Sequence, residues 1–252
     1  MRDNEIAKGL FIFYEALFIK SEKALVVADL HLGIEDALHK EGALIPRTNF
    51  NSILKKLTKI LEKINKNFSI STLEYLIING DLKHEFGEIS KQEWQETLAM
   101  IDFLASKTKR LILVKGNHDT ILGPIAKKRN LEILDYFSLN SFAFAHGHKI
   151  IEPAKIAKAE ILVIAHEHPA AVLSDGVKNE RYKCFLLGKY RRKKLIVMPA
   201  ISALMHGSNI LSETLLSPYL QKANILNFEV WLLAEKPYYF GKVKNLYDIR
   251  PF

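Results

Sequence analysis

Histidine and aspartate side chains recur in this sequence directly after short apolar runs. Asp29 and His31 are two residues apart, and His166 and His168 have the same spacing. In an extended segment this spacing points both side chains to the same side of the chain. Carboxylate oxygens and imidazole nitrogens held in this way can share one divalent cation. The two pairs therefore predict metal coordination.

Further polar residues follow apolar runs in the same manner: Asp81, Asn117, His118 and His146. A carboxylate has two oxygens, so Asp81 can bridge two ions, and Asn117 offers a neutral carbonyl oxygen. Together with His148, which follows His146 by two residues, six of the nine histidines lie in such motifs, where unpaired polar groups would be costly. Two aspartates, one asparagine and four histidines predict a site for two divalent ions about 3.5 Å apart. Whether His146 or His148 supplies the fourth histidine stays open.

The ligand types restrict the metal. Cys184 is the one cysteine, so thiolate cages and intramolecular disulfides are both excluded. Mixed imidazole and carboxylate ligands favour manganese, iron, zinc, cobalt or nickel over calcium or magnesium. Manganese is the expected ion, with the other four as alternatives.

The elements that must position these residues are short apolar runs, each ending at a polar motif: 25–28, 76–78, 111–114, 142–145 and 161–165. Such runs are typical of strands that are buried on both faces. Ligands bind at the carboxyl ends of parallel strands. We therefore expect the polar residues to converge at one edge of the sheets.

The rest of the chain alternates between helical and extended patterns. Apolar residues have helical spacing over 49–64, and Ser90 with Glu93 forms a capping-box pattern for a helix ending near 105. Residues 10–19 are expected to form one or two edge strands, 125–129 a short helix, and the basic run 189–194 a hairpin turn. Additional strands are expected at 24–28, 73–78, 110–114, 131–135, 142–145, 161–165, 182–188, 194–198 and 226–233.

The overall charge and the distribution of apolar residues fit a globular enzyme. Thirty-six lysines and arginines against 28 aspartates and glutamates give a net charge of +8, which suits a polyanionic substrate but is also compatible with solubility alone. No window reaches the roughly 18 apolar residues of a membrane span, and Glu15 interrupts the apolar N-terminal stretch. We expect a cytoplasmic α/β protein with one domain over 1–252, built from two mixed sheets flanked by helices. A homodimer stays open.

In their order along the chain, the motifs resemble those of the calcineurin-like metallophosphoesterases. They are Asp29-Leu30-His31, Gly80-Asp81, Gly116-Asn117-His118-Asp119, His146-Gly147 and His166-Glu167-His168. The resemblance covers more than half of the chain and implies a four-layer αββα sandwich with a dinuclear site. Ala165 departs from the family pattern, which usually has glycine before the last pair.

The resemblance also implies roles for individual residues. One ion would be bound by Asp29, His31, Asp81 and His168, and the other by Asp81, Asn117, His146 and His166. His118 would act as the acid, or as the transition-state donor, near the leaving oxygen.

A finer resemblance depends on His84, which follows Asp81 by three residues. The SbcD-type nuclease branch has a histidine at this place that supports His118, whereas the phosphoprotein-phosphatase branch has aspartate followed by Arg-Gly. The closest group is that of the archaeal SbcD-related phosphoesterases. The nuclease proper carries a separate DNA-capping domain, for which 252 residues leave little room.

These features predict a metal-dependent phosphoesterase that cleaves phosphodiesters, with DNA or RNA as candidate substrates. One alternative is a phosphomonoesterase or a cyclic-nucleotide phosphodiesterase, against which His84 argues. Another is a nucleic-acid-binding subunit that retains the fold without turnover. The complete ligand set argues against that reading.

Overall fold

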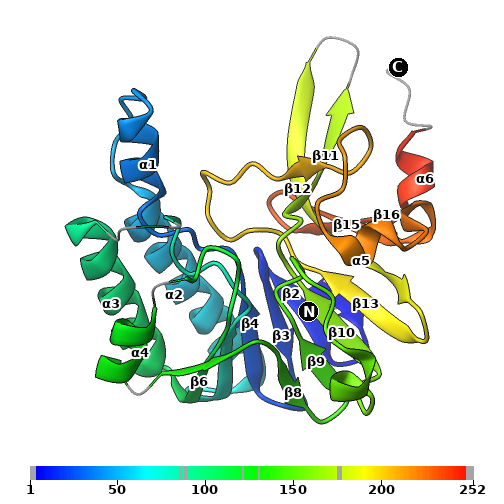
Figure 1. Ribbon diagram of the computed structural model, residues 1–252. Coiled ribbons are helices and arrows are strands. Elements are labelled where there is room, and N and C mark those ends of the chain that lie inside the picture. Colours follow the sequence, from blue (N-terminus) through cyan, green and yellow to red (C-terminus); the bar gives the residue numbers. More distant parts are fainter. Residues whose placement is uncertain are drawn as a thin grey trace.

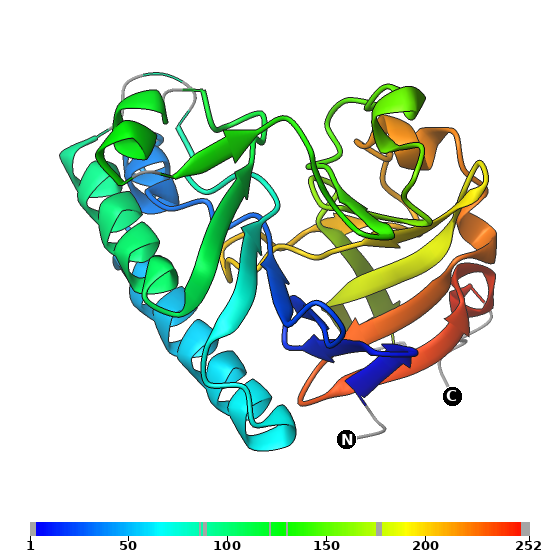
Figure 2. The ribbon, with the colours of Figure 1, turned by 90° about the horizontal axis from the view of Figure 1, so that it is seen from below.

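The computed structural model describes residues 4–85, 87, 90–120, 122–129, 131–174 and 178–247. Two mixed β-sheets pack face to face, and long helices cover the outer face of the first sheet (Figure 1). Shorter helices lie on the outer side of the second sheet (Figure 2). The expected sandwich of two mixed sheets flanked by helices is confirmed.

The first sheet contains seven strands in chain order: β1 (Glu5–Ala7), β2 (Leu10–Phe13), β3 (Ala16–Ile19), β4 (Ala24–Val27), β5 (Leu73–Ile78), β6 (Thr108–Val114) and β7 (Glu132–Leu134). Neighbours from β1 to β4 pair antiparallel, and neighbours from β4 to β7 pair parallel. Because β4, β5 and β6 are parallel, the motifs that follow them lie at the same edge.

One expectation for this sheet is wrong. Residues 10–19 form β2 and β3, which are inner strands with every residue buried, and β1 takes the edge. Aromatic rings on one face of these strands, Phe11 and Phe18, contact Phe68 at the end of a helix. Residues on the other face belong to the core between the sheets. Strands that are apolar on both faces are covered on both faces.

Four helices accompany the first sheet: α1 (Ile34–Lys40), α2 (Asn49–Phe68), α3 (Lys91–Ala105) and α4 (Gly123–Arg129). The expected cap of α3 is confirmed, because Ser90 Oγ accepts a hydrogen bond from the Glu93 N–H at 3.0 Å. The Glu93 carboxylate does not complete a capping box. It accepts hydrogen bonds from the N–H groups of His84 and Glu85, at 3.0 Å each.

The second sheet contains β8 (Phe137–Leu139), β9 (Phe142–Phe144), β10 (Ile161–Ile164), β11 (Pro169–Ser174), β12 (Asn179–Tyr190), β13 (Lys193–Val197), β14 (Ser208–Asn209), β15 (Glu229–Leu233) and β16 (Pro237–Lys242). Its short helices are η2 (Pro153–Ile156), α5 (Pro218–Gln221), η3 (Ile225–Asn227) and α6 (Val243–Leu246). The basic run forms the expected turn, with Arg191 in a left-handed conformation between β12 and β13.

A shared core joins the two sheets. Val26, Ile77 and Ile112 of the first sheet belong to the same buried cluster as Phe144 and Val163 of the second. Burial of this apolar surface stabilises the pairing of the sheets. It also fixes the ends of β4, β5 and β6 relative to the ends of β9 and β10. Among the described residues, no helix combines the length and apolar character that crossing a membrane requires.

Candidate metal centre

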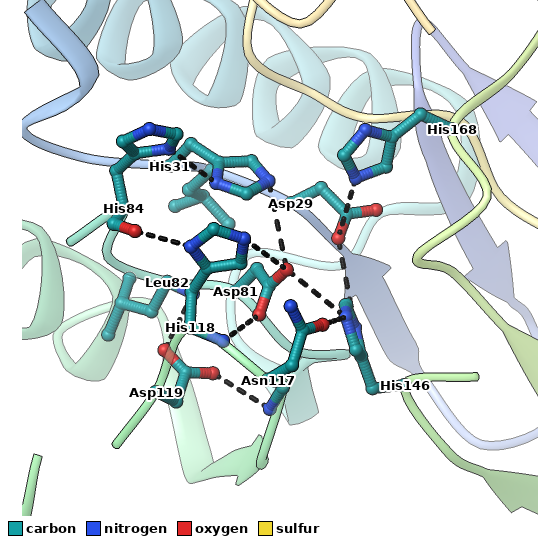
Figure 3. Close-up of polar contacts among 12 residues, drawn as sticks. Asp29, His31, Asp81, Leu82, His84, Asn117, His118, Asp119, His146 and His168 are labelled. Carbon is teal, nitrogen blue, oxygen red and sulfur yellow. Dashed lines mark hydrogen bonds and ion pairs between the residues drawn. The ribbon is translucent and has the colours of Figure 1, made fainter. Parts of the chain in front are cut away.

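The polar motifs of both sheets converge at one edge of the sandwich, around the carboxylate of Asp81 (Figure 3). The loops after β4, β5 and β6 supply one side of the cluster, and the loops after β9 and β10 supply the other. Three groups have potential ligand atoms within 4.8 Å of one another: His31, His84 and His118; Asp29, His31 and His168; and Asp81, His146 and His166. These groups could hold a metal ion.

The backbone of the ligand loops is unusual. Asp29, His31, Asp81, His166 and His168 all have positive φ angles, between 45° and 67°. A residue other than glycine adopts this region at a cost of about 1–3 kcal/mol, and such strain gathers at functional sites. The pairs therefore lie in left-handed turns beyond their strands, not in the extended backbone that the two-residue spacing suggested. Their side chains nevertheless converge.

The loops after β4 and β5 continue the pairing of their strands. The N–H groups of Asp29, His31 and Leu32 donate to the carbonyls of Gly80, Asp81 and Leu82, each at 3.0 Å. This ladder holds the first ligand pair against the loop that carries Asp81.

Two glycines permit close packing around the centre. A Cβ atom on Gly116 would lie 2.0 Å from Asp81 Oδ1, and one on Gly80 would lie 2.1 Å from His146 Nδ1. Neither position has room for a larger residue without displacing a candidate ligand. The glycines before Asp81 and Asn117 are thus required by the approach of neighbouring side chains.

Asp81 occupies the middle of the cluster. Its Oδ2 atom lies 3.1 Å from His146 Nε2, 3.8 Å from His31 Nε2 and 4.0 Å from His118 Nε2. Burial raises the pKa of Asp81, but the charges of the surrounding histidines outweigh burial and hold that pKa below its usual value. Burial lowers the pKa of His146, yet the Asp81 carboxylate raises it to about 9. This ring and carboxylate pair therefore favours a bound cation, whether a proton or a metal ion.

The orientation of His146 suits a ligand. Its Nδ1–H donates to the carbonyl of Asn79 at 3.0 Å, and its Nε2 faces Asp81 and the Asn117 Oδ1 atom, which is 3.1 Å away. A backbone acceptor at one ring nitrogen fixes which nitrogen is left for a metal. His148 is half-buried with its ring 5.3 Å from that of His146, and it belongs to none of the three groups. The geometry favours His146 over His148 as the ligand.

The candidate ligand atoms of Asp29, His31 and His168 are buried and lack hydrogen bonds. Neither oxygen of Asp29 accepts a hydrogen bond, and neither His31 Nε2 nor His168 Nε2 makes one. His168 Nε2 lies 3.2 Å from Asp29 Oδ1 in an orientation that is not a hydrogen bond. A buried carboxylate without hydrogen bonds is costly, and a divalent cation would satisfy it. The donors present here fit such an ion.

His84 and His118 lie beside this cluster. The two rings stack with centroids 5.2 Å apart, and His84 Nδ1 lies 3.1 Å from His31 Nδ1. His118 Nδ1–H donates to the backbone carbonyl of His84. Burial, and then His118, lower the pKa of His84 to about 4. The resemblance implied that His84 supports His118, and the hydrogen-bond contact between them is made by the carbonyl oxygen of His84, not by its imidazole.

Two buried carboxylates to which the sequence assigned no role, Asp119 and Glu167, hold the ligand loops. Asp119 accepts hydrogen bonds from Leu82 N–H at 3.0 Å and from Gly116 N–H at 2.9 Å, tying together the loops after β5 and β6. Burial, and then Asp81, raise the pKa of Asp119 to about 6. Glu167 accepts from the N–H groups of Leu216 and Ser217, at 2.9 and 2.8 Å. Both acids lie within the sequence motifs that contain the candidate ligands, and that position is the signal that could have identified them.

The turn-rich stretch around His206 lies beside the centre. Ser208 N–H donates to the carbonyl of His168 at 3.0 Å. His206 itself is exposed and belongs to none of the three groups.

A solved structure shares this fold, and others match it more weakly. The nuclease MPE of Pseudomonas putida superimposes with a TM-score of 0.62 at 20% identity, covering 91% of this chain and 94% of that one. Vps29 of Cryptosporidium parvum matches at 16% identity and a TM-score of 0.38, covering 87% and 97%. Zinc-complexed Vps29 of Entamoeba histolytica matches at 14% identity and a TM-score of 0.38, covering 86% and 99%. The comparison with curated proteins returned no match.

A family model, that of the calcineurin-like phosphoesterases, matches residues 23–207, which is more than half of the chain. The matched range contains all five motifs and every residue of the three histidine and aspartate groups. Proteins of this family use divalent metals, and the donors gathered around Asp81 are of the kind that such ions bind. The chain belongs to the calcineurin-like phosphoesterase family.

Proposed function

We propose that this protein is a dinuclear metal-dependent phosphoesterase that hydrolyses phosphodiester bonds, with nucleic acid as its substrate class. The observation that carries the proposal is the pair of donor groups on either side of Asp81. Asp29, His31 and His168 form one group, and His146 and His166 form the other with Asp81 itself. A carboxylate between two such groups is suited to bridge two ions.

The ligand sets follow from this arrangement. One ion would be held by Asp29, His31, Asp81 and His168. The other would be held by Asp81, His146 and His166, with Asn117 as a further oxygen donor beside His146. Manganese is our proposed ion, and iron, zinc, cobalt and nickel suit the same donors. A bound pair of ions would polarise the phosphate and lower the pKa of a water molecule to ~7.

His118 is placed to move a proton. Its Nδ1–H is held by the carbonyl of His84, so the other ring nitrogen is the one that can deliver a proton into the site. That nitrogen, Nε2, lies 4.0 Å from Asp81 Oδ2. His118 would then donate its Nε2 proton to the leaving oxygen.

Three observations support diesters in nucleic acid over monoesters. His84 follows Asp81 by three residues, as in the SbcD-type nuclease branch, and we propose the archaeal SbcD-related group as the nearest relatives. The net charge is +8, which suits a polyanion. The structure with a TM-score of 0.62 is that of a nuclease.

A substrate screen tests the proposal. Manganese-loaded protein would be assayed on bis-p-nitrophenyl phosphate, p-nitrophenyl phosphate, cyclic nucleotides and single-stranded DNA. We expect the diester and the DNA to be cleaved faster than the monoester, with all activity lost in chelator. Faster cleavage of the monoester would favour a phosphomonoesterase. Absence of turnover with metal bound would favour a non-catalytic nucleic-acid-binding subunit.

We also make proposals about the domain organisation, the cellular location and the oligomeric state of the protein. We infer one domain over residues 1–252, which predicts a single cooperative calorimetric transition of the metal-free protein. We propose a cytoplasmic location, which subcellular fractionation tests. Light scattering after size exclusion decides between a monomer and a homodimer.

A further inference from the structure

We propose that Lys183 is a positioning residue for one of the two ions, and that it acts through residues 200–208, which we call the strap. The proposal rests on the proposed function, because it requires that Asp29, His31 and His168 bind an ion. Lys183 lies on β12 and belongs to none of the three donor groups.

The strap contacts the backbone of candidate ligands from both sheets. It leaves β13, passes the end of β4 and returns to β14 beside β11 (Figure 1). Ser202 N–H donates to the carbonyl of Asp29 at 3.4 Å, next to a bond from Ile201 N–H to Ala28 at 3.0 Å. At its other end, Ser208 N–H donates to the carbonyl of His168 at 3.0 Å. One segment therefore links Asp29 to His168.

The strap also reaches His31. Ser202 Oγ donates to Asn49 Oδ1 at 2.8 Å, and Asn49 Nδ2 lies 3.3 Å from the carbonyl oxygen of His31, to which it donates. All three members of this donor group are thus connected to the strap. Within the described part of the chain, no hydrogen bond joins the strap to Asp81, His146 or His166.

Lys183 connects the strap to β12 of the second sheet. Its Nζ donates to the carbonyl of Ala200 at 2.7 Å and to the carbonyl of Ser202. From the other side, Lys56 of α2 donates to the carbonyl of Ile201 at 3.0 Å, while Glu15 neutralises its charge at 2.7 Å. Three successive carbonyls are therefore held by two ammonium groups, and Lys183 supplies the contacts from the second sheet.

Removal of the Lys183 ammonium group would leave two strap carbonyls without a donor. The strap would then loosen at the residues that hold Asp29 and, through Asn49, His31. Loss of a contact that orients a metal ligand typically lowers metal affinity by about 10- to 100-fold. We expect that loss for the ion of Asp29, His31 and His168, and no comparable loss for the ion of Asp81, His146 and His166.

Manganese titration in two backgrounds separates the ions. His166→Ala removes a proposed ligand of the ion held by Asp81, His146 and His166, so the remaining manganese affinity reports on the site of Asp29, His31 and His168. His168→Ala removes a proposed ligand of that latter site, so the remaining affinity reports on the site of His146. Lys183→Met should weaken binding by about 10-fold or more in the His166→Ala background, and change it by less than about 3-fold in the other.

The matched control is Lys193→Met. Lys193 also lies in the second sheet and also donates to two backbone carbonyls, those of Ala157 and Ala159, but it does not contact the strap. It should leave both affinities unchanged. If Lys183→Met does not fold, Lys183→Gln, which retains a single amide donor group, replaces it.

Equal losses in the two backgrounds, or no loss in either, would overturn the role of Lys183. A wild-type protein that binds no manganese would instead refute the proposed function, so the two failures are distinguishable.

Discussion

At the level of single residues, the candidate metal centre depends on electrostatic attraction between the Asp81 carboxylate and the histidine rings around it. Asp81 Oδ2 faces three histidine nitrogens, and the pKa values of Asp81 and His146 move apart because of their mutual attraction. His118 differs from the other two rings in exposure, because 16% of its side chain is accessible, against 1% or less for His31 and His146. We propose that this more accessible ring carries a proton, whereas the two buried rings bind metal.

His118→Ala should therefore keep both ions and lose rate. Because the ring is proposed to donate a proton and not to bind metal, kcat should fall by about 10²–10⁴-fold. Single-turnover kinetics and metal analysis of the same sample provide the check. His39→Ala is the control, since His39 bonds to the carbonyl of Ile45 and lies outside the donor groups. Loss of an ion in His118→Ala would show that the residue is a ligand.

His84→Ala should cost less than His118→Ala. The carbonyl that holds His118 survives the substitution, while the stacked ring and its contact with His31 are lost. A misoriented acid slows poor leaving groups most, because they need the proton more. The rate on single-stranded DNA should fall more than the rate on p-nitrophenyl esters. An equal fall on both substrates would mean that His84 does not support the acid.

Residue types and spacing predicted which side chains gather, but not which atom of His84 contacts His118. The motifs indicate nitrogen and oxygen donors at strand ends, and that information is local. The acceptor depends on the path of the loop after β5, which runs through a left-handed Asp81 and is held by Glu93. Glu93 lies on α3, so the path is set by a contact between distant parts of the chain.

At the scale of elements, the loops after β5 and β6 approach closely because Gly116 has no side chain. Gly116→Ala should disrupt the centre, since the new Cβ would lie 2.0 Å from Asp81 Oδ1. We expect loss of metal binding in an equilibrium titration. Gly123→Ala is the matched control, because nothing lies within 4 Å of its Cβ position and neither glycine has a positive φ. Similar metal binding by the two variants would contradict this packing.

Asp119→Asn should destabilise the same pair of loops. The amide replaces one of the oxygens that accept from Leu82 and Gly116 with a donor, leaving a buried N–H without a partner. The free energy of unfolding of metal-free protein in urea should fall by about 1–3 kcal/mol. Asp102→Asn is the control, since Asp102 pairs with Arg129 on the surface of α3. Equal stability of Asp119→Asn and wild type would exclude the proposed tie.

Helices and strands were predicted correctly where the sequence pattern is local, and they were missed where pairing with a neighbouring strand determines the conformation. Residues 73–78 form β5 as expected, and α3 begins after Ser90. The sequence did not reveal β11 or β16, which both begin with proline, a residue that usually marks a turn or loop in a sequence although the first position of a strand tolerates it. Each is extended because a neighbouring strand pairs with it, β12 for β11 and β15 for β16.

At the scale of the whole molecule, Lys183 couples stability to pH. Burial lowers its pKa from 10.5 to about 8. Between these values the unfolded chain holds a proton that the folded chain has released, so the free energy of unfolding rises with pH. Below about 8 both states are protonated, and this lysine adds no pH dependence.

The stability of wild type relative to Lys183→Met should therefore increase between pH 8 and pH 9.5, by up to about 2 kcal/mol. Urea unfolding of both proteins in chelator at these two pH values provides the measurement. The comparison with Lys183→Met cancels the titration of other groups. A constant difference, or one that decreases with pH, would show that Lys183 keeps its ordinary pKa in the folded protein.

We propose that both sheets contribute to one dinuclear centre bridged by Asp81, and the metal content of the protein is the decisive measurement. Protein stripped with chelator would be reconstituted with manganese, freed of excess ion and analysed for metal per chain, alongside Asp81→Asn. We expect about two ions per chain in wild type, since two donor groups share the carboxylate, and fewer in the variant. One ion or less in wild type, with equal content in Asp81→Asn, would contradict it.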